Sequence, residues 1–253
     1  MREIRVIHDS PAAGAWNMAV DEALLETAAD SGIVTVRFYR WSEPTLSLGY
    51  FQAAIERARH AASCDCPLVR RASGGGAILH DRELTYSIAM PQTSARSSEA
   101  TALYELFHET LIATLAELGV SAALFRATAS CRSESTSGAS SDTFLCFQRR
   151  TCIDVICESA KIAGSAQRRR RGAIMQHGSI LLAQSPFAPE LPGIQELTGL
   201  RIDPPELAVR WTTHLQRRLL ATFTAASLTP AEEGRARQLV GGRFASPEYL
   251  HRR

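Results

Sequence analysis

Residues 70–81 read RRASGGGAILHD, in which three consecutive glycines follow a short apolar run that is typical of a strand. Gly74, Gly75 and Gly76 lack side chains, so the backbone there can approach a ligand closely and turn its N–H groups toward an oxygen. The spacing differs from the Walker A and GxGxxG signatures, so it does not predict a nucleotide site. From these residues alone, a substrate-contacting loop and a simple tight turn are equally open.

Hydrophobic spacing on both sides of this segment predicts a mixture of helices and strands. Apolar residues at helical spacing predict helices over 14–29, 100–118, 205–226 and 230–240. β-Branched and aromatic residues predict strands over 33–41, 45–49, 84–90, 151–157, 161–167 and 173–182. The serine-rich segment 129–141 is low in hydrophobic residues and is expected to be a mobile loop.

The whole chain reads as one domain over residues 1–253, with a short helical tail from about residue 228, because no repeat or linker divides it. Its net charge of +2 does not favour a nucleic-acid partner. No apolar run has the length of a signal peptide or a membrane span, so we expect a cytoplasmic protein without a membrane partner. Six cysteines without a CxxC pair do not favour a bound metal.

The use of cations is more informative than the net charge. Of the 28 basic residues, only Lys161 is a lysine. A compact ammonium fits where a planar guanidinium does not, so Lys161 marks a functional position or a chance survivor, and the count alone leaves both open. The arginine run 168–171 is expected to form a solvated turn, although an acidic partner could also use it.

A second motif, KIAGSAQ at 161–167, is followed by QHGSIL at 176–181. Its small residues Ala163, Gly164 and Ser165 leave room on one strand face for an extended aliphatic chain. Close packing within a sheet is the alternative explanation, and it is favoured when the motif is taken alone.

Together with NMAVDEALL at 17–25, these motifs occur in the order found in the lipoate-protein ligase A and octanoyltransferase family of the biotin/lipoate protein ligase superfamily, which this sequence resembles over about residues 5–225. The resemblance implies an α/β (α+β) fold, with a mixed, largely antiparallel sheet flanked by helices as in the biotin ligase catalytic domain. It also implies an acyl tunnel beside the glycine loop and a catalytic role for Lys161. The positions expected to bind substrate are Arg71, Ser73, Gly74, Gly75, Gly76, His80, Ala163, Gly164, Ser165, His177 and Gly178.

The family includes two chemistries. Its ligases activate free lipoate with ATP, and many carry a C-terminal accessory domain, for which the 25 or so residues beyond the resemblance are too few. Ligases with that domain on a separate chain keep the ligase alternative open. In a cysteine-dependent octanoyltransferase subgroup, and in related amidotransferases, a nucleophilic Cys followed by Phe precedes the hairpin of the lysine, and Cys146-Phe147 matches that pair.

We therefore expect Cys146 and Lys161 to be catalytic, with the ammonium favouring the thiolate, although a buried or idle thiol is the alternative for Cys146. Cys152 and Cys157 fall in a predicted strand and are expected to pack as small hydrophobic residues. The remaining thiols have no motif and are expected to be bystanders; they are Cys64, Cys66 and Cys131.

The expected reaction takes octanoyl from acyl carrier protein, through a thioester on Cys146, to a lysine of a lipoyl domain such as that of the glycine cleavage H protein. It needs no cofactor, whereas a ligase needs ATP and Mg. His80 or His177 is a candidate base for the acceptor amine, and a structural role is equally open for each. Transfer between lipoyl domains, carrier binding without catalysis, and lipoyl as the native group also stay open.

Overall fold

An eight-stranded sheet forms the centre of the protein in the computed structural model, which describes residues 2–92, 97–125 and 143–252. Its strands, in chain order, are β1 Arg2–His8, β2 Thr35–Tyr39, β6 Glu83–Pro91, β7 Ala122–Leu124, β8 Val155–Cys157, β9 Ala160–Arg170, β10 Ala173–Leu181 and β11 Ala221–Ala225. They lie in the order β11-β1-β2-β6-β10-β9-β8-β7. β1 runs parallel to β11 and β2, and the other neighbours are antiparallel, so the expected mixed, largely antiparallel sheet is confirmed.

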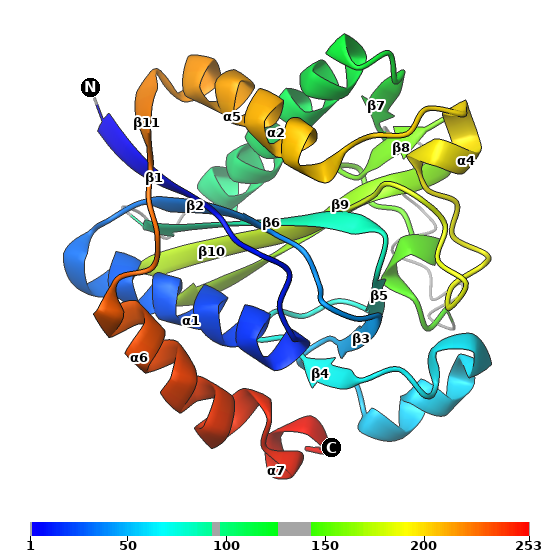
Figure 1. The fold of residues 1–253 in the computed structure, drawn as a ribbon, viewed down its shortest axis with the longest axis horizontal. Coiled ribbons are helices and arrows are strands. Elements are labelled where there is room, and N and C mark those ends of the chain that lie inside the picture. Colours follow the sequence, from blue (N-terminus) through cyan, green and yellow to red (C-terminus); the bar gives the residue numbers. More distant parts are fainter. Residues whose placement is uncertain (1, 93–96, 126–142, 253) are drawn as a thin grey trace.

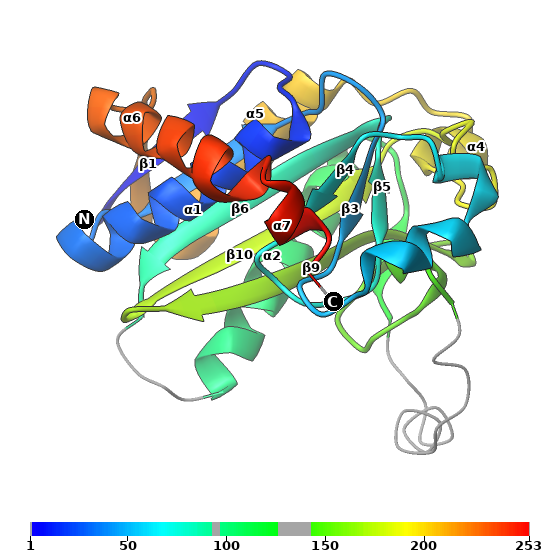
Figure 2. The same ribbon diagram turned by 90° about the horizontal axis from the view of Figure 1, so that it is seen from below.

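Helices cover both faces of this sheet (Figure 1). α1, Gly14–Ser31, and α6, Pro230–Leu239, pack on one face, where α1 contributes apolar side chains to the core. α2, Ser97–Glu117, and α5, Pro204–Leu219, pack on the other around Phe107 and Trp211. Figure 2 shows α6 alongside α1 on the near face. The sheet is thus buried on both sides, which fixes the strands that carry the site.

A small second sheet, in the order β4-β3-β5, holds the glycine segment. Its strands are β3 Thr45–Leu48, β4 Leu68–Arg70 and β5 Ile78–His80. A third apolar cluster, which includes Leu46, Leu48 and Leu79, anchors this sheet. The short elements are η1 Ala54–Arg59, η2 Ala61–Ser63, η3 Cys146–Gln148, α4 Ile194–Thr198, η4 Val240–Phe244 and α7 Pro247–Leu250.

The helix expected over 205–226 is wrong beyond Leu219. Leu220 adopts a left-handed φ of 49°, which ends α5, and the following residues pair with β1 as strand β11. The β-branched Thr222 and Thr224 suit that strand. Helical periodicity could not show the pairing, because β1 and β11 lie at opposite ends of the chain.

Two local expectations around the second motif are also wrong. Residues 151–154 form a turn before β8, and Cys152 is exposed there, whereas Cys157 is buried as expected. The run 168–171 is not a solvated turn, because Arg168 and Arg170 belong to β9 and form ion pairs with the buried Glu22 of α1. The serine-rich segment 129–141, with Cys131, lies outside the described residues. Within the described ranges, no helix is long and apolar enough to cross a membrane.

Candidate active site

A cavity of about 320 Å³ lies between the glycine loop and strands β9 and β10. Its walls are formed by Met18, Tyr39, Arg71, Gly74, Gly75, Ile78, His80, Thr85, Tyr104, Cys146, Phe147, Lys161, Gly164, Ser165, Ala166, Gln167, His177, Gly178 and Ser179. The three motifs and the Cys-Phe pair therefore meet at one place. The volume is at the lower end of the range for small-molecule sites, which suits a slender substrate.

Glycine is required where the loop meets β3 and where it turns. A Cβ atom on Gly49 would lie 1.9 Å from the backbone oxygen of Gly75, which no side chain can tolerate. Gly75 itself has a φ of 96°, in the region that favours glycine. These two positions bring the loop backbone close to the cavity and leave its surface free of side chains.

Cys146 is held against the glycine loop by backbone pairing. Leu145 forms an isolated bridge with Ala77, and the Cys146 N–H donates to the Ala77 carbonyl over 2.7 Å. Leu145 and Phe144 are buried in the third apolar cluster, so they anchor the segment at that bridge. Cys146 is only partly buried and lines the cavity, whereas Cys66 and Cys157 are buried elsewhere.

Lys161 reaches the cavity as one half of a buried ion pair. Its Nζ lies 2.9 Å from Asp154 Oδ2, and the two side chains are only 4% and 5% exposed. A Cβ atom on Gly164 would lie 2.6 Å from Lys161 Cε and 2.9 Å from Nζ, so the lysine fills the space that this glycine leaves. A wider guanidinium would need more room than this, which favours the functional interpretation of the only lysine.

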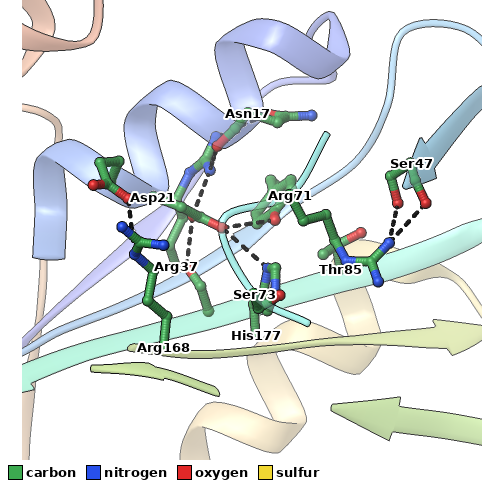
Figure 3. A network of polar contacts seen from close by, with 12 residues as sticks. Asn17, Asp21, Arg37, Ser47, Arg71, Ser73, Thr85, Arg168 and His177 are labelled. Carbon is green, nitrogen blue, oxygen red and sulfur yellow. Dashed lines mark hydrogen bonds and ion pairs between the residues drawn. The ribbon is translucent and has the colours of Figure 1, made fainter. Parts of the chain in front are cut away.

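A second buried network ties α1 to the glycine loop through β10 (Figure 3). Asp21 Oδ2 lies 3.7 Å from His177 Nδ1, and His177 Nε2 lies 2.5 Å from Ser73 Oγ. Arg37 and Tyr39 also donate to the Asp21 carboxylate, each over 2.9 Å. Burial alone would raise the pKa of Asp21, but the nearby His177 imidazole and the charge of Arg37 outweigh it, so this pKa lies below its ordinary value. Asp21 is therefore a buried carboxylate that orients His177.

The Ser165 hydroxyl is hydrogen-bonded to one side chain from α2 and one from β6. Its oxygen lies 2.7 Å from His108 Nε2 and 2.7 Å from the Tyr86 hydroxyl. Burial lowers the pKa of His108, which keeps the imidazole neutral. A Cβ atom on Gly178 would lie only 2.4 Å from Ser165 Oγ, so this glycine of β10 keeps the cavity open.

Most of the positions expected from the sequence meet at the cavity. Of the others, Ser73 and Gly76 belong to the loop beside it, and Gly76 accepts a hydrogen bond from Arg71. Ala163 is not brought there, because it is buried in the core on the α2 side of the sheet. No role was predicted from the sequence for Asp21, although it lies inside the NMAVDEALL motif at 17–25, or for Asp154.

A family model, the lipoyl protein ligase A/B catalytic domain, matches residues 13–188. The chain belongs to this family. A protein named octanoyltransferase LipM from Brevibacillus brevis is 32% identical over 278 residues, which cover all of both chains. Proteins with the same name from Kyrpidia tusciae and Bacillus subtilis are 39% and 38% identical over 74% and 70% of this chain, and the matches cover 69% and 65% of those proteins.

Solved structures of the family share this fold over nearly the whole chain. A putative lipoate protein ligase from T. acidophilum with bound lipoic acid has a TM-score of 0.78 at 21% identity, and covers 98% of this chain and 99% of its own. A lipoate-protein ligase A bound with ATP has a TM-score of 0.78 at 22% identity, and the match covers 98% of each chain. The fold expected from the resemblance is therefore confirmed.

Proposed function

We propose that this member of the family is an octanoyltransferase that moves an octanoyl group from acyl carrier protein, through Cys146, to a lysine of a lipoyl domain. The observation that carries the proposal is the position of Cys146, which lines the same cavity as Lys161 and Arg71. A relative named octanoyltransferase that matches over the full length of both chains supports octanoyl as the group transferred.

In the first half of the reaction, the Cys146 thiolate attacks the thioester carbonyl of the donor. A carbon–sulfur bond forms to Cys146, the bond to the donor sulfur breaks, and the donor leaves as a thiol after it takes up a proton. The loop backbone at Gly74 and Gly75 faces the cavity, and we assign its N–H groups to the oxyanion of the tetrahedral intermediate. One thioester replaces another, so the step needs neither ATP nor a metal ion.

In the second half, the acceptor lysine attacks the Cys146 thioester, an amide forms, and the Cys146 thiolate is released. The attacking amine must lose a proton, and we assign its uptake to His177, which lines the cavity. The Asp21 carboxylate beyond it would stabilise the imidazolium. We assign a positioning role to His80, because burial lowers its pKa and its two ring nitrogens lie 2.7 Å from Ser47 and Glu83.

An ATP-dependent ligase is the main alternative, because solved relatives of this fold include a lipoate-protein ligase A bound with ATP. A ligase would load free acid only in the presence of ATP and would not need Cys146. Transfer from one lipoyl domain to another is a second alternative, which shares the thioester and differs only in the donor.

The proposal is tested by intact-protein mass spectrometry after mixing with octanoyl-acyl carrier protein without ATP. We expect a hydroxylamine-labile octanoyl adduct on the native protein and on Cys152→Ser, whose thiol is exposed outside the cavity, but not on Cys146→Ser. Octanoylated H protein as the sole effective donor would identify the lipoyl-domain transfer. Modification of a lipoyl domain only with ATP and free octanoate, and equally by Cys146→Ser, would refute the thioester mechanism.

A further inference from the structure

The two cations that line the cavity differ in how their charges are compensated. Lys161 faces the carboxylate of Asp154 at 2.9 Å, so its ammonium is neutralised within the buried pair. Arg71 is 2% exposed, yet among the described residues it forms no ion pair with a carboxylate. Its guanidinium is therefore the buried positive charge that remains available to a negative group in the cavity.

Within the described ranges, the hydrogen bonds of Arg71 all go to neutral oxygens. Nη1 donates to the carbonyl and the hydroxyl of Ser47, each over 2.7 Å, and Nη2 donates to the Gly76 carbonyl over 2.8 Å. Nε is buried without a hydrogen-bond partner among the described residues. Burial lowers the pKa of Arg71 to about 10, which leaves it charged at neutral pH, and a thiolate at Cys146 is the strongest influence that opposes this shift.

Arg71 Nη2 and Cys146 Sγ both lie close to Gly75. A Cβ atom built on Gly75 would lie 3.6 Å from Arg71 Nη2 and 4.0 Å from Cys146 Sγ, and the sum of these distances is an upper limit on the separation of nitrogen and sulfur. The titratable groups that line the cavity around the thiol are Tyr39, Arg71, His80, Tyr104, Lys161 and His177. Of the two basic side chains Arg71 and Lys161, Lys161 is paired with Asp154, whereas Arg71 has no carboxylate partner within the part of the chain that the structure describes.

We propose that the Arg71 guanidinium, and not the Lys161 ammonium, is the cation that stabilises the Cys146 thiolate. A buried series of hydrogen bonds from Glu83 through His80 and Ser47 holds this guanidinium in place. This inference rests on the proposed function only in taking Cys146 as the nucleophile. It assigns Lys161, with Asp154, to the wall that receives the acyl group.

The hydrogen bonds that link Glu83, His80 and Ser47 to Arg71 have one consistent set of donors and acceptors. His80 Nδ1 lies 2.7 Å from Glu83 Oε1, and His80 Nε2 lies 2.7 Å from Ser47 Oγ. Burial lowers the pKa of His80, so we assign the neutral imidazole with its proton on Nδ1, where it is donated to the Glu83 carboxylate. Nε2 then accepts from the Ser47 hydroxyl, whose oxygen accepts from Arg71. Stacking of His80 on the Trp41 ring at 3.9 Å fixes the imidazole plane, so Ser47 and His80 are positioning residues.

The test follows alkylation of Cys146 by iodoacetamide from pH 5 to 9, with peptide mass spectrometry reporting each thiol separately. In Arg71→Gln we expect the alkylation rate of Cys146 at pH 7 to fall about tenfold and the rate profile to move to higher pH. Alkylation of the exposed Cys152 in the same sample should not change and serves as the internal control. Arg71→Lys, which keeps a charge, should recover part of the loss.

Two further variants keep the inference testable if Arg71→Gln fails to fold. Ser47→Ala removes the support of the guanidinium and should move the profile in the same direction by a smaller amount. Lys161→Met combined with Asp154→Asn removes the neutralised pair at nearly constant volume and should leave the profile in place. If the double variant moves the profile and neither Arg71→Gln nor Ser47→Ala does, Lys161 is the activating cation and the inference is overturned. The assay uses no acyl donor, so its outcome is independent of whether octanoyl-acyl carrier protein is the substrate.

Discussion

Asp154→Asn should destabilise the protein strongly, because it leaves the Lys161 ammonium buried without a counter-ion. Both side chains are about 5% exposed or less, and their charged atoms lie 2.9 Å apart. Removing one partner of such a pair typically costs about 3–5 kcal/mol, whereas an exposed pair contributes at most about 1 kcal/mol. Asparagine keeps the size of the side chain and can still accept the hydrogen bond from the Thr151 N–H, so the loss of charge is isolated.

The assay is thermal unfolding at pH 7.5, supported by urea titration. For a protein of this size, 3 kcal/mol lowers the melting temperature by at least about 6 °C. The matched control is Asp154→Asn with Lys161→Met, which removes both charges and should regain most of the stability, because a buried pair contributes little over apolar side chains. A melting temperature of Asp154→Asn within about 2 °C of that of the native protein would refute the buried-pair argument. The argument would also be refuted if the double variant were no more stable than Asp154→Asn.

Three further predictions test other parts of the site. Gly178→Ala should slow octanoylation of Cys146 at least about tenfold while iodoacetamide still reacts, because the added methyl group overlaps Ser165 Oγ in the cavity. Because burial lowers the pKa of His80, stability should fall as the pH drops below about 6.5, by up to about 2 kcal/mol at pH 5, and melting curves of His80→Asn should show a flatter dependence. Deleting residues 247–253 should lower the melting temperature by about 6 °C or more, because Arg70 loses three backbone carbonyls to which it donates.

The sequence predicted the fold class and most of the cavity because the relevant signals are local. The helix predicted over 14–29 is confirmed as α1, and the glycine run forms the loop after β4, as its sequence indicated. β11 escaped prediction because its reason to be extended is a parallel neighbour at the other end of the chain. Amphipathic periodicity continued smoothly past Leu219, and only the left-handed backbone at Leu220 stops the helix.

The electrostatics of the site were the least predictable part. Lys161 stood out by its rarity, but the sequence did not show that the Asp154 turn neutralises it. Asp154 precedes the lysine by seven residues, in a segment that the sequence pattern assigns to a strand but that forms a turn in the structure. Which cation acts on the thiol depends on where the carboxylates lie, and that arrangement is set by tertiary packing.

The twin arginines of the glycine motif show how adjacent residues divide two tasks. Successive side chains of an extended segment point to opposite sides, so Arg70 at the end of β4 turns away from the cavity while Arg71 turns into it. Arg70 donates to the carbonyls of Gly49 and Gln52 and to those of the C-terminal tail, which ties the loop after β3 and the tail to the motif. Arg71 can then remain rigid, although among the residues that the structure describes it has no carboxylate partner of its own. A guanidinium held by carbonyls keeps its full charge for the thiol, so the same feature that makes this residue costly to bury makes it effective beside Cys146.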